Sequence, residues 1–238
     1  MTTVFVENLV KADLLTALKD IETFLQGALK ELHTKGELIE RDQFNMARVD
    51  SLIRGLNAQV VDGGFGPAIT DMMAGLMEIE GEVKKELGKD LEGASKFTAE
   101  SEQAIQMLLT DAQSDMLKLA NLEADSLSSY IRKSVLGGGK LSDLLTQISK
   151  ELTIRYNQAM VLATTAIYSF KQMVTLDIAD RLGVVWYVYR GPLDKITREW
   201  CEHWVGYRGT LEMFEATADK FGRESQPNPV KYWRGGYG

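Results

Sequence analysis

Proline, cysteine and histidine are scarce in this chain of 238 residues, which contains four, one and two of them respectively. A single cysteine excludes an intramolecular disulfide framework. The prolines lie at positions 67, 192, 227 and 229, so none interrupts the segment from Ala68 to Gly191. Because an internal proline breaks a helix, that gap permits long helices through the middle of the chain.

Long apolar runs and an excess of positive charge are also absent. No segment holds the roughly 18 consecutive apolar residues of a membrane-spanning helix. Glu7 and Asp13 come too early for the apolar core of a secretory signal. The 27 basic and 34 acidic side chains give a net charge of -7. We therefore expect no membrane segment, no cleaved signal and no chain-wide surface for nucleic acid.

Most of the chain shows apolar residues at helical spacing. The pattern predicts helices over residues 8–33, 38–60, 68–90, 98–135 and 142–182. The predicted breaks between them are rich in glycine and include Gly36, the loop Asp62–Pro67 and Gly137–Gly139. Glu123 and Ser126 interrupt a coiled-coil-like seam in the fourth helix, and Ser142 is the predicted N-cap of the fifth. The helices can be either partly extended or bundled. We favour the partly extended arrangement, because the apolar seams are narrow and interrupted.

The C-terminal part has a different composition, because all four tryptophans and three of the four prolines follow residue 185. The β-branched and aromatic run around Val184–Tyr189 predicts a strand over 183–190. Short helices up to residue 222 follow, one capped by Asp194 and one over Leu211–Phe221, and then a turn-rich tail. The sequence thus predicts a mainly α fold with a small α+β C-terminal domain. We place a helical N-terminal region at 1–138 and the C-terminal domain at 139–238.

The densest group of reactive side chains lies between residues 194 and 203. Asp194 and Arg198 are four residues apart and can pair across one helical turn. Cys201 and His203 are candidate zinc ligands, but a structural zinc site needs about four ligands, and His33 and carboxylates are the remaining candidates. A Cys–His nucleophilic pair is the alternative, although side chains two apart on a helix point about 200° away from each other. A buried structural thiol is favoured over both.

Other chemical signatures are weak or missing. The sequence contains no phosphate-binding G-x-x-x-x-G-K-[ST] run, no H-E-x-x-H and no G-x-S-x-G. We therefore expect no enzyme activity and no cofactor. The tail mixes cations with aromatic rings, which can meet phosphates and stack on bases. The candidate nucleic-acid contacts are Arg223, Lys231, Trp233 and Arg234.

An ordered motif runs through the C-terminal part. Its residues are Trp186, Tyr189, Gly191, Asp194, Thr197, Arg198 and Cys201, followed by a turn with Gly235, Gly236 and Tyr237. This order resembles the signature of the tailed-phage head morphogenesis proteins, also called Mu F-type minor head proteins. The resemblance covers about residues 140–238. The family pattern continues into a second Cys/His group, whereas this sequence ends at Gly238.

The resemblance implies a structural rather than a catalytic role. Minor head proteins associate with the portal or the inner capsid in several copies per virion, and they assist head assembly, DNA packaging or DNA delivery. It implies location in the phage head or head–tail connector after assembly in the host cytoplasm. Contact of the tail with packaged DNA is a candidate interaction that rests on the cations and aromatic rings of the tail itself. Two alternatives stay open. One is a metal-dependent hydrolase or nuclease using Asp194, Cys201 and His203; the other is a scaffolding or tail- or neck-associated helical protein.

Overall fold

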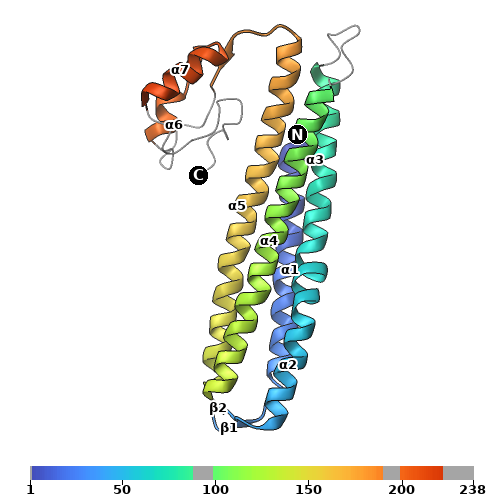
Figure 1. Cartoon of the computed structure of the whole chain (residues 1–238), viewed down its shortest axis with the longest axis vertical. Coiled ribbons are helices and arrows are strands. Elements are labelled where there is room, and N and C mark those ends of the chain that lie inside the picture. The colour runs from blue at the N-terminus through green and yellow to red at the C-terminus, as the bar shows by residue number, and fades with distance from the viewer. Residues whose placement is uncertain (1, 88–98, 190–198, 222–238) are drawn as a thin grey trace. The chain divides into compact units, whose positions relative to one another are not determined.

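The computed structural model describes residues 2–87, 99–189 and 199–221, and its fold is mainly α with a small α+β module near the C-terminus, as predicted (Figure 1). The elements are α1 (Thr2–Leu29), β1 (Thr34–Lys35), β2 (Leu38–Ile39), α2 (Gln43–Asn57), the π-helix η1 (Ala58–Phe65), α3 (Gly66–Leu87), α4 (Ala99–Gly137), α5 (Leu141–Arg181), β3 (Tyr187–Val188), α6 (Glu199–Trp204), β4 (Arg208–Gly209) and α7 (Leu211–Phe221). None of the described helices is long and apolar enough to cross a membrane.

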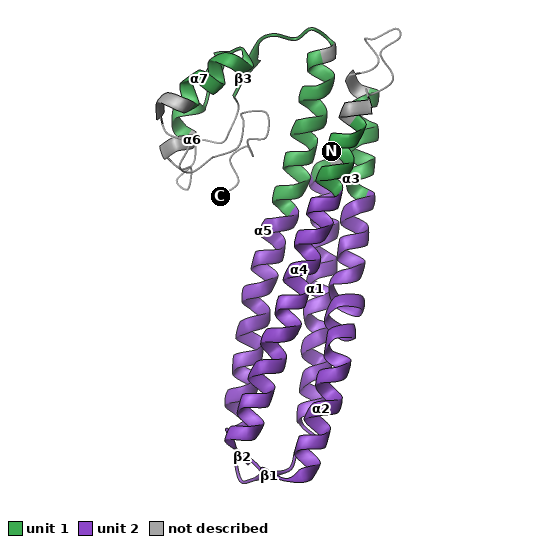
Figure 2. Cartoon of the chain, viewed as in Figure 1, with its two compact units in different colours: residues 1–3, 75–109, 164–238 green, residues 4–74, 110–163 purple. Residues whose placement is uncertain are grey.

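The chain forms two compact units, each assembled from segments far apart in sequence (Figure 2). Unit 1 comprises residues 1–3, 75–109 and 164–238, and unit 2 comprises residues 4–74 and 110–163. Helices α3, α4 and α5 contribute residues to both units. The predicted domains 1–138 and 139–238 stay a prediction.

Unit 2 is a bundle in which α1, the α2–η1–α3 path, α4 and α5 run side by side (Figure 1). Its core follows the predicted helical spacing: Leu14, Ile21 and Leu25 are buried on α1, and Leu144, Ile148 and Leu152 are buried on α5. Of the two arrangements that the seams left open, unit 2 adopts the bundled one.

The start of the second predicted helix was placed too early. Residues 34–39 instead form an antiparallel hairpin in which Thr34 pairs with Ile39 and Lys35 with Leu38. Gly36 turns the hairpin with a φ of 66°, a value that suits glycine. Helix α2 begins only at Gln43, because the Asp42 carboxylate caps it by accepting a 2.7 Å hydrogen bond from the Asn45 amide.

The loop predicted over Asp62–Pro67 is wrong. The chain stays helical there, passing through η1 directly into α3. Packing explains the difference, since Val60 and Phe65 are buried and Gly64 lies against Ile21 of α1. Tertiary contacts at these positions override the local turn preference of the glycines and the proline.

The break between α4 and α5 is confirmed, with a one-residue correction. Helix α4 ends at Gly137, and Gly138 follows with a φ of 63°. The Gly139 amide then donates a 2.8 Å hydrogen bond to the Ser134 carbonyl, as in a common helix C-terminal motif. Helix α5 begins at Leu141, so Ser142 lies inside its first turn rather than at the N-cap position.

The C-terminal module in unit 1 is built on an aromatic core. Strands β3 and β4 pair antiparallel, with Tyr187 opposite Gly209. Buried Trp204 stacks on Phe214 at a centroid distance of 5.6 Å, and both pack with Ala218 of α7. Helix α7 spans Leu211–Phe221 as predicted.

The other boundaries of this module differ from the prediction. The strand predicted over 183–190 is reduced to Tyr187–Val188, because Gly183 turns the chain after α5 with a φ of 68° and Val184–Trp186 pair with no described strand. Helix α6 is described from Glu199 onward. The predicted N-cap Asp194 and the turn-rich tail after 222 lie outside the described residues.

Candidate functional site

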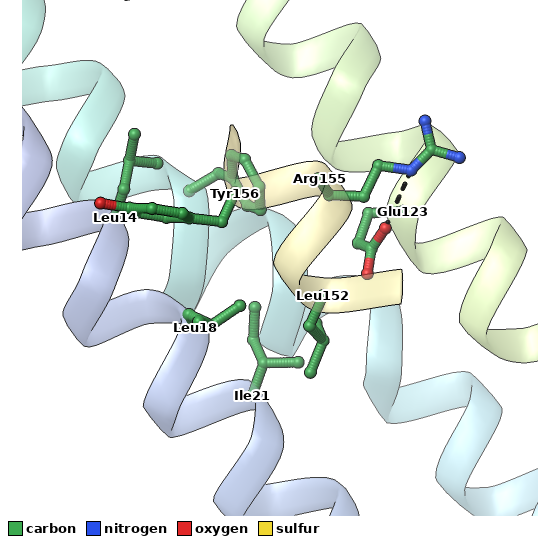
Figure 3. Close-up of a pocket in the computed structure, with 8 residues that line it drawn as sticks. Leu14, Leu18, Ile21, Glu123, Leu152, Arg155 and Tyr156 are labelled. Atoms are coloured by element: carbon green, nitrogen blue, oxygen red, sulfur yellow. Dashed lines mark ion pairs between the residues drawn. The ribbon is translucent and has the colours of Figure 1, made fainter. Parts of the chain in front are cut away.

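The most unusual group in unit 2 is a largely buried set of three charged side chains, of which Figure 3 shows Glu123 and Arg155. Helix α4 supplies Glu123, which is 0% exposed, and α5 supplies Glu151 and Arg155 one turn apart. Arg155 Nε lies 3.1 Å from Glu123 Oε2, and Arg155 Nη2 lies 3.1 Å from Glu151 Oε1. The Arg155 guanidinium therefore pairs with two carboxylates, one on α4 and one on its own helix α5.

Mostly apolar side chains lie beside two members of this charged triad of Glu123, Glu151 and Arg155, and the Arg155 side chain is 21% exposed. A cavity of about 10 Å³ adjoins Glu123 and Arg155. Its remaining lining consists of Leu14, Leu18, Ile21, Phe65, Leu152 and Tyr156. Such a volume suits about one water molecule, whereas ligand pockets measure roughly 300–1,000 Å³. The cavity cannot admit a substrate, so the triad is part of the bundle core rather than of an active-site cleft.

The electrostatics of the triad are dominated by burial. Loss of water raises the pKa of the Glu123 carboxyl from 4.5 to about 7, the Arg155 charge opposes that rise, and the Glu151 charge adds to it. The Oε1 atom of Glu123 has no hydrogen-bond partner among the described residues. Glu123 thus titrates near neutral pH inside the bundle, which is an uncommon position for a carboxyl group.

Glu123 occupies a seam position of α4, where the sequence predicts an interruption of the apolar spacing. In the structure this position is buried, as are Ala120, Ala124 and Leu127 nearby on the helix. The burial of Glu123 and its pairing with Arg155 were not predicted. The signal available in the sequence was the spacing itself, since positions 116, 120, 123 and 127 continue one helical stripe.

Two motif residues of the C-terminal module are described and lie in different environments. Trp186 is 62% exposed just before β3. Tyr189 packs against the aromatic core, and its amide donates a 2.9 Å hydrogen bond to the Tyr207 carbonyl. The other predicted motif and nucleic-acid contact residues lie outside the described part of the chain: Gly191, Asp194, Thr197, Arg198, Arg223, Lys231, Trp233, Arg234, Gly235, Gly236 and Tyr237.

The predicted Cys201–His203 pair belongs to α6. The His203 side chain is exposed, and its ring meets the edge of the Trp204 ring at a centroid distance of 5.8 Å. The side chain of Cys201 lies outside the described part of the structure. The zinc site suggested by this pair therefore stays a prediction.

A different group, at the hairpin end of unit 2, was not singled out from the sequence. Ligand atoms of His33, Glu40 and Asp42 lie within 4.8 Å of one another. His33 Nδ1 and Asp42 Oδ2 are 2.8 Å apart, and hydrogen bonds from the Asn45 amide and then from His33 hold the pKa of Asp42 below its ordinary value. These contacts cap α2 and close the hairpin, which gives the group a structural role in this fold.

The buried side chain of Asn45 organises that hairpin end. Its Oδ1 accepts a 2.8 Å hydrogen bond from the His33 amide, and its Nδ2 donates to the carbonyls of His33 and Glu40, each at 2.8 Å. Asn45 is 0% exposed, so these three bonds satisfy an amide that is fully removed from water.

A second carboxyl pair lies on the side of unit 2 where η1 meets α3. Burial raises the pKa of Asp13 on α1, and the hydrogen bond and negative charge of Asp71 on α3 add to the rise. Asp62, Thr70 and Asp71 line an open groove there.

Comparison with known proteins found nothing similar: no family model matches the chain, and neither a curated protein nor a solved structure matches it significantly.

Proposed function

We propose that the protein is a phage virion structural protein of the minor head type. In this role it binds the portal or the inner capsid and assists head assembly, DNA packaging or DNA delivery. The helical bundle of unit 2 serves as the body, and the C-terminal module serves as the part that contacts other virion proteins. The motif resemblance over residues 140–238 motivates the assignment.

The observation that carries the proposal is the exposure of apolar side chains in the motif segment just before β3. Val185 and Trp186 are 61% and 62% exposed. Neighbouring Tyr187 instead packs on the Trp204 core. An exposed tryptophan beside an exposed valine favours a protein–protein contact, since aromatic side chains are enriched among the residues that dominate such interfaces.

The proposal is tested by deleting the gene from the phage genome that encodes it and supplying the protein from a plasmid. We expect purified particles to contain the chain, as measured by quantitative mass spectrometry, and DNA-filled heads to decrease without it. If the chain is absent from purified particles while present in the lysate, the proposal is wrong.

A pair of variants tests the contact itself. We expect Trp186→Ala to lower the amount of chain per particle at least tenfold, which corresponds to about 1.4 kcal/mol of lost binding. Met107 is 61% exposed and lies on α4, so Met107→Ala is a matched control that removes an equally exposed apolar side chain outside the motif. Equal incorporation of both variants would argue against a contact through the motif segment before β3.

A further inference from the structure

The π-helix η1 is the least regular part of the described helices. It spans Ala58–Phe65 and joins α2 to α3 without a loop, and the Gly66 amide hydrogen-bonds to the Val61 carbonyl five residues earlier (Figure 1). Such helices occur mostly as single-turn bulges, frequently at functional positions. A stretch of 8 residues is therefore long for this geometry.

Close contacts explain Gly64 of η1 and Gly66, the first residue of α3. A Cβ on Gly64 would lie 2.9 Å from Ile21 Cδ1, and one on Gly66 would lie 3.1 Å from the Val61 carbonyl oxygen. Neither position has room for a larger residue without movement. Both glycines thus allow the chain to pack as it does in this conformation.

Gly63 has no such explanation. The nearest atom to its added Cβ would be Gln59 Nε2 at 3.6 Å, which is an ordinary contact, and its φ is not positive. Glycine in a helix is less favourable than alanine by roughly 1 kcal/mol. In the conformation seen here, Gly63 weakens the helical path and provides no packing in return.

The sequence around Gly63 contains the signals for ending one helix and beginning another. Glycine after a helix favours the left-handed conformation that terminates it. Pro67 is the second residue of α3, close to the first-turn position that proline prefers. The helical path is held instead by buried Val60 and Phe65 and by the contact of Gly64 with Ile21.

We propose that residues 62–66 form a hinge between two conformations of unit 2. In one conformation, the chain follows the continuous helical path from α2 into α3. In the other, Gly63 adopts a left-handed backbone, α2 ends before it, and α3 begins again at Pro67 at an angle to α2. The buried contacts of Val60 and Phe65 favour the continuous form, and Gly63 makes the bent form accessible.

Amide hydrogen exchange of the full chain tests this hinge. We expect the amides of residues 60–66 to exchange faster than those of the buried turns around Leu56 and Leu76, because local opening exposes them. Gly63→Ala should slow this exchange at least fivefold, or about 1 kcal/mol, since alanine favours the helical form. Gly81→Ala is the matched control: it lies on α3, nothing is within 4 Å of its added Cβ, and it should leave residues 60–66 unchanged.

A distance measurement separates bending from simple fraying. Spin labels at Ser51→Cys on α2 and Ala74→Cys on α3, both exposed positions of unit 2, are attached in a Cys201→Ser background. The continuous path separates them by roughly 35 Å at 1.5 Å per residue. We expect a second, shorter distance that Gly63→Ala depletes and Gly81→Ala does not. A single distance unaffected by Gly63→Ala, or equal slowing of exchange by both alanines, would overturn the hinge.

Discussion

Replacing Glu123 with glutamine should stabilise the bundle, and the gain should grow with pH. The substitution Glu123→Gln exchanges a fully buried carboxyl group for a neutral amide of nearly the same shape. The amide can still face Arg155, which remains paired with Glu151 at 3.1 Å. The variant therefore removes the titration of one group while keeping the packing around it.

The magnitude follows from the difference in pKa between the folded and unfolded chains. The folded-state pKa of Glu123 is raised from 4.5 to about 7, so the unfolded chain releases this proton at a lower pH than the folded chain does. The free energy of unfolding consequently falls as pH rises from about 4.5 to about 7 and then levels off. Linkage gives a loss of about 2.5 kcal/mol between pH 5 and pH 8 for this group alone. Glutamine does not titrate, so the variant does not undergo this loss. The difference in free energy of unfolding between the variant and the natural chain should therefore increase by about 2.5 kcal/mol from pH 5 to pH 8.

Urea denaturation at pH 5 and pH 8, followed by circular dichroism at 222 nm, measures the effect. Circular dichroism is the suitable signal because it reports the helices, whereas all four tryptophans lie at or after residue 186. Asp125→Asn is the matched control, since Asp125 is an exposed carboxylate on the same helix. A stability difference between the Glu123→Gln and natural chains that is equal at the two pH values, within about 0.5 kcal/mol, would refute the argument from burial.

Three further substitutions test other parts of the structure. Arg155→Met should lower the free energy of unfolding by about 3–5 kcal/mol at pH 8, where it removes the counter-charge of the buried Glu123 carboxyl group. The loss should be smaller at pH 5 in the same denaturation assay. Asn45→Ala should cost about 3 kcal/mol, because three hydrogen bonds of about 1 kcal/mol each are lost from a buried amide; a loss below 1 kcal/mol would show that water replaces it. Phe214→Ala should lower the free energy of unfolding of the C-terminal module by about 3–5 kcal/mol. Tryptophan emission should then shift to the red, with little change in ellipticity at 222 nm. A parallel loss of both signals would show that the helices depend on this module.

The helices could be predicted because their apolar spacing is a local property of the sequence. Leu14, Ile21 and Leu25 repeat at helical intervals and are buried in the structure. The same holds for Leu211–Phe221, whose predicted and observed limits agree. Here the short-range pattern and the tertiary fold favour the same conformation, which is the condition under which such predictions succeed.

The errors occurred where long-range contacts decide the conformation. Asp62–Pro67 has the composition of a turn, but the packing of Gly64 against Ile21 on a distant helix keeps it helical. The hairpin before α2 depends on Asn45, whose side chain bonds to the backbone of His33, 12 residues earlier in the chain. Neither partner can be identified from the neighbouring sequence alone.

The candidate site was predicted only in part, for a related reason. The motif strand was located by its aromatic and β-branched residues, although the observed strand is limited to Tyr187–Val188. The partnership of Glu123 with Arg155 joins residues on different helices and becomes visible only when α4 and α5 are packed together. A charged residue on an apolar stripe indicates either exposure or a buried partner, and the sequence does not contain the distance that separates these cases.

The charged triad also bears on how α4 and α5 align, because it joins the two helices. Arg155 is the α5 residue that pairs with Glu123, whereas the buried residues one turn away are a second acid, Glu151, and the apolar Leu152 and Ala159. Sliding α5 by one turn would therefore place the Glu123 carboxyl against a side chain that cannot pair with it, and an isolated buried charge is strongly unfavourable. Alternative alignments of purely apolar seams would differ much less in free energy. We therefore expect the charge that lowers the stability of the bundle at neutral pH also to favour this alignment over its neighbours, in the way that single buried polar residues specify register in coiled coils.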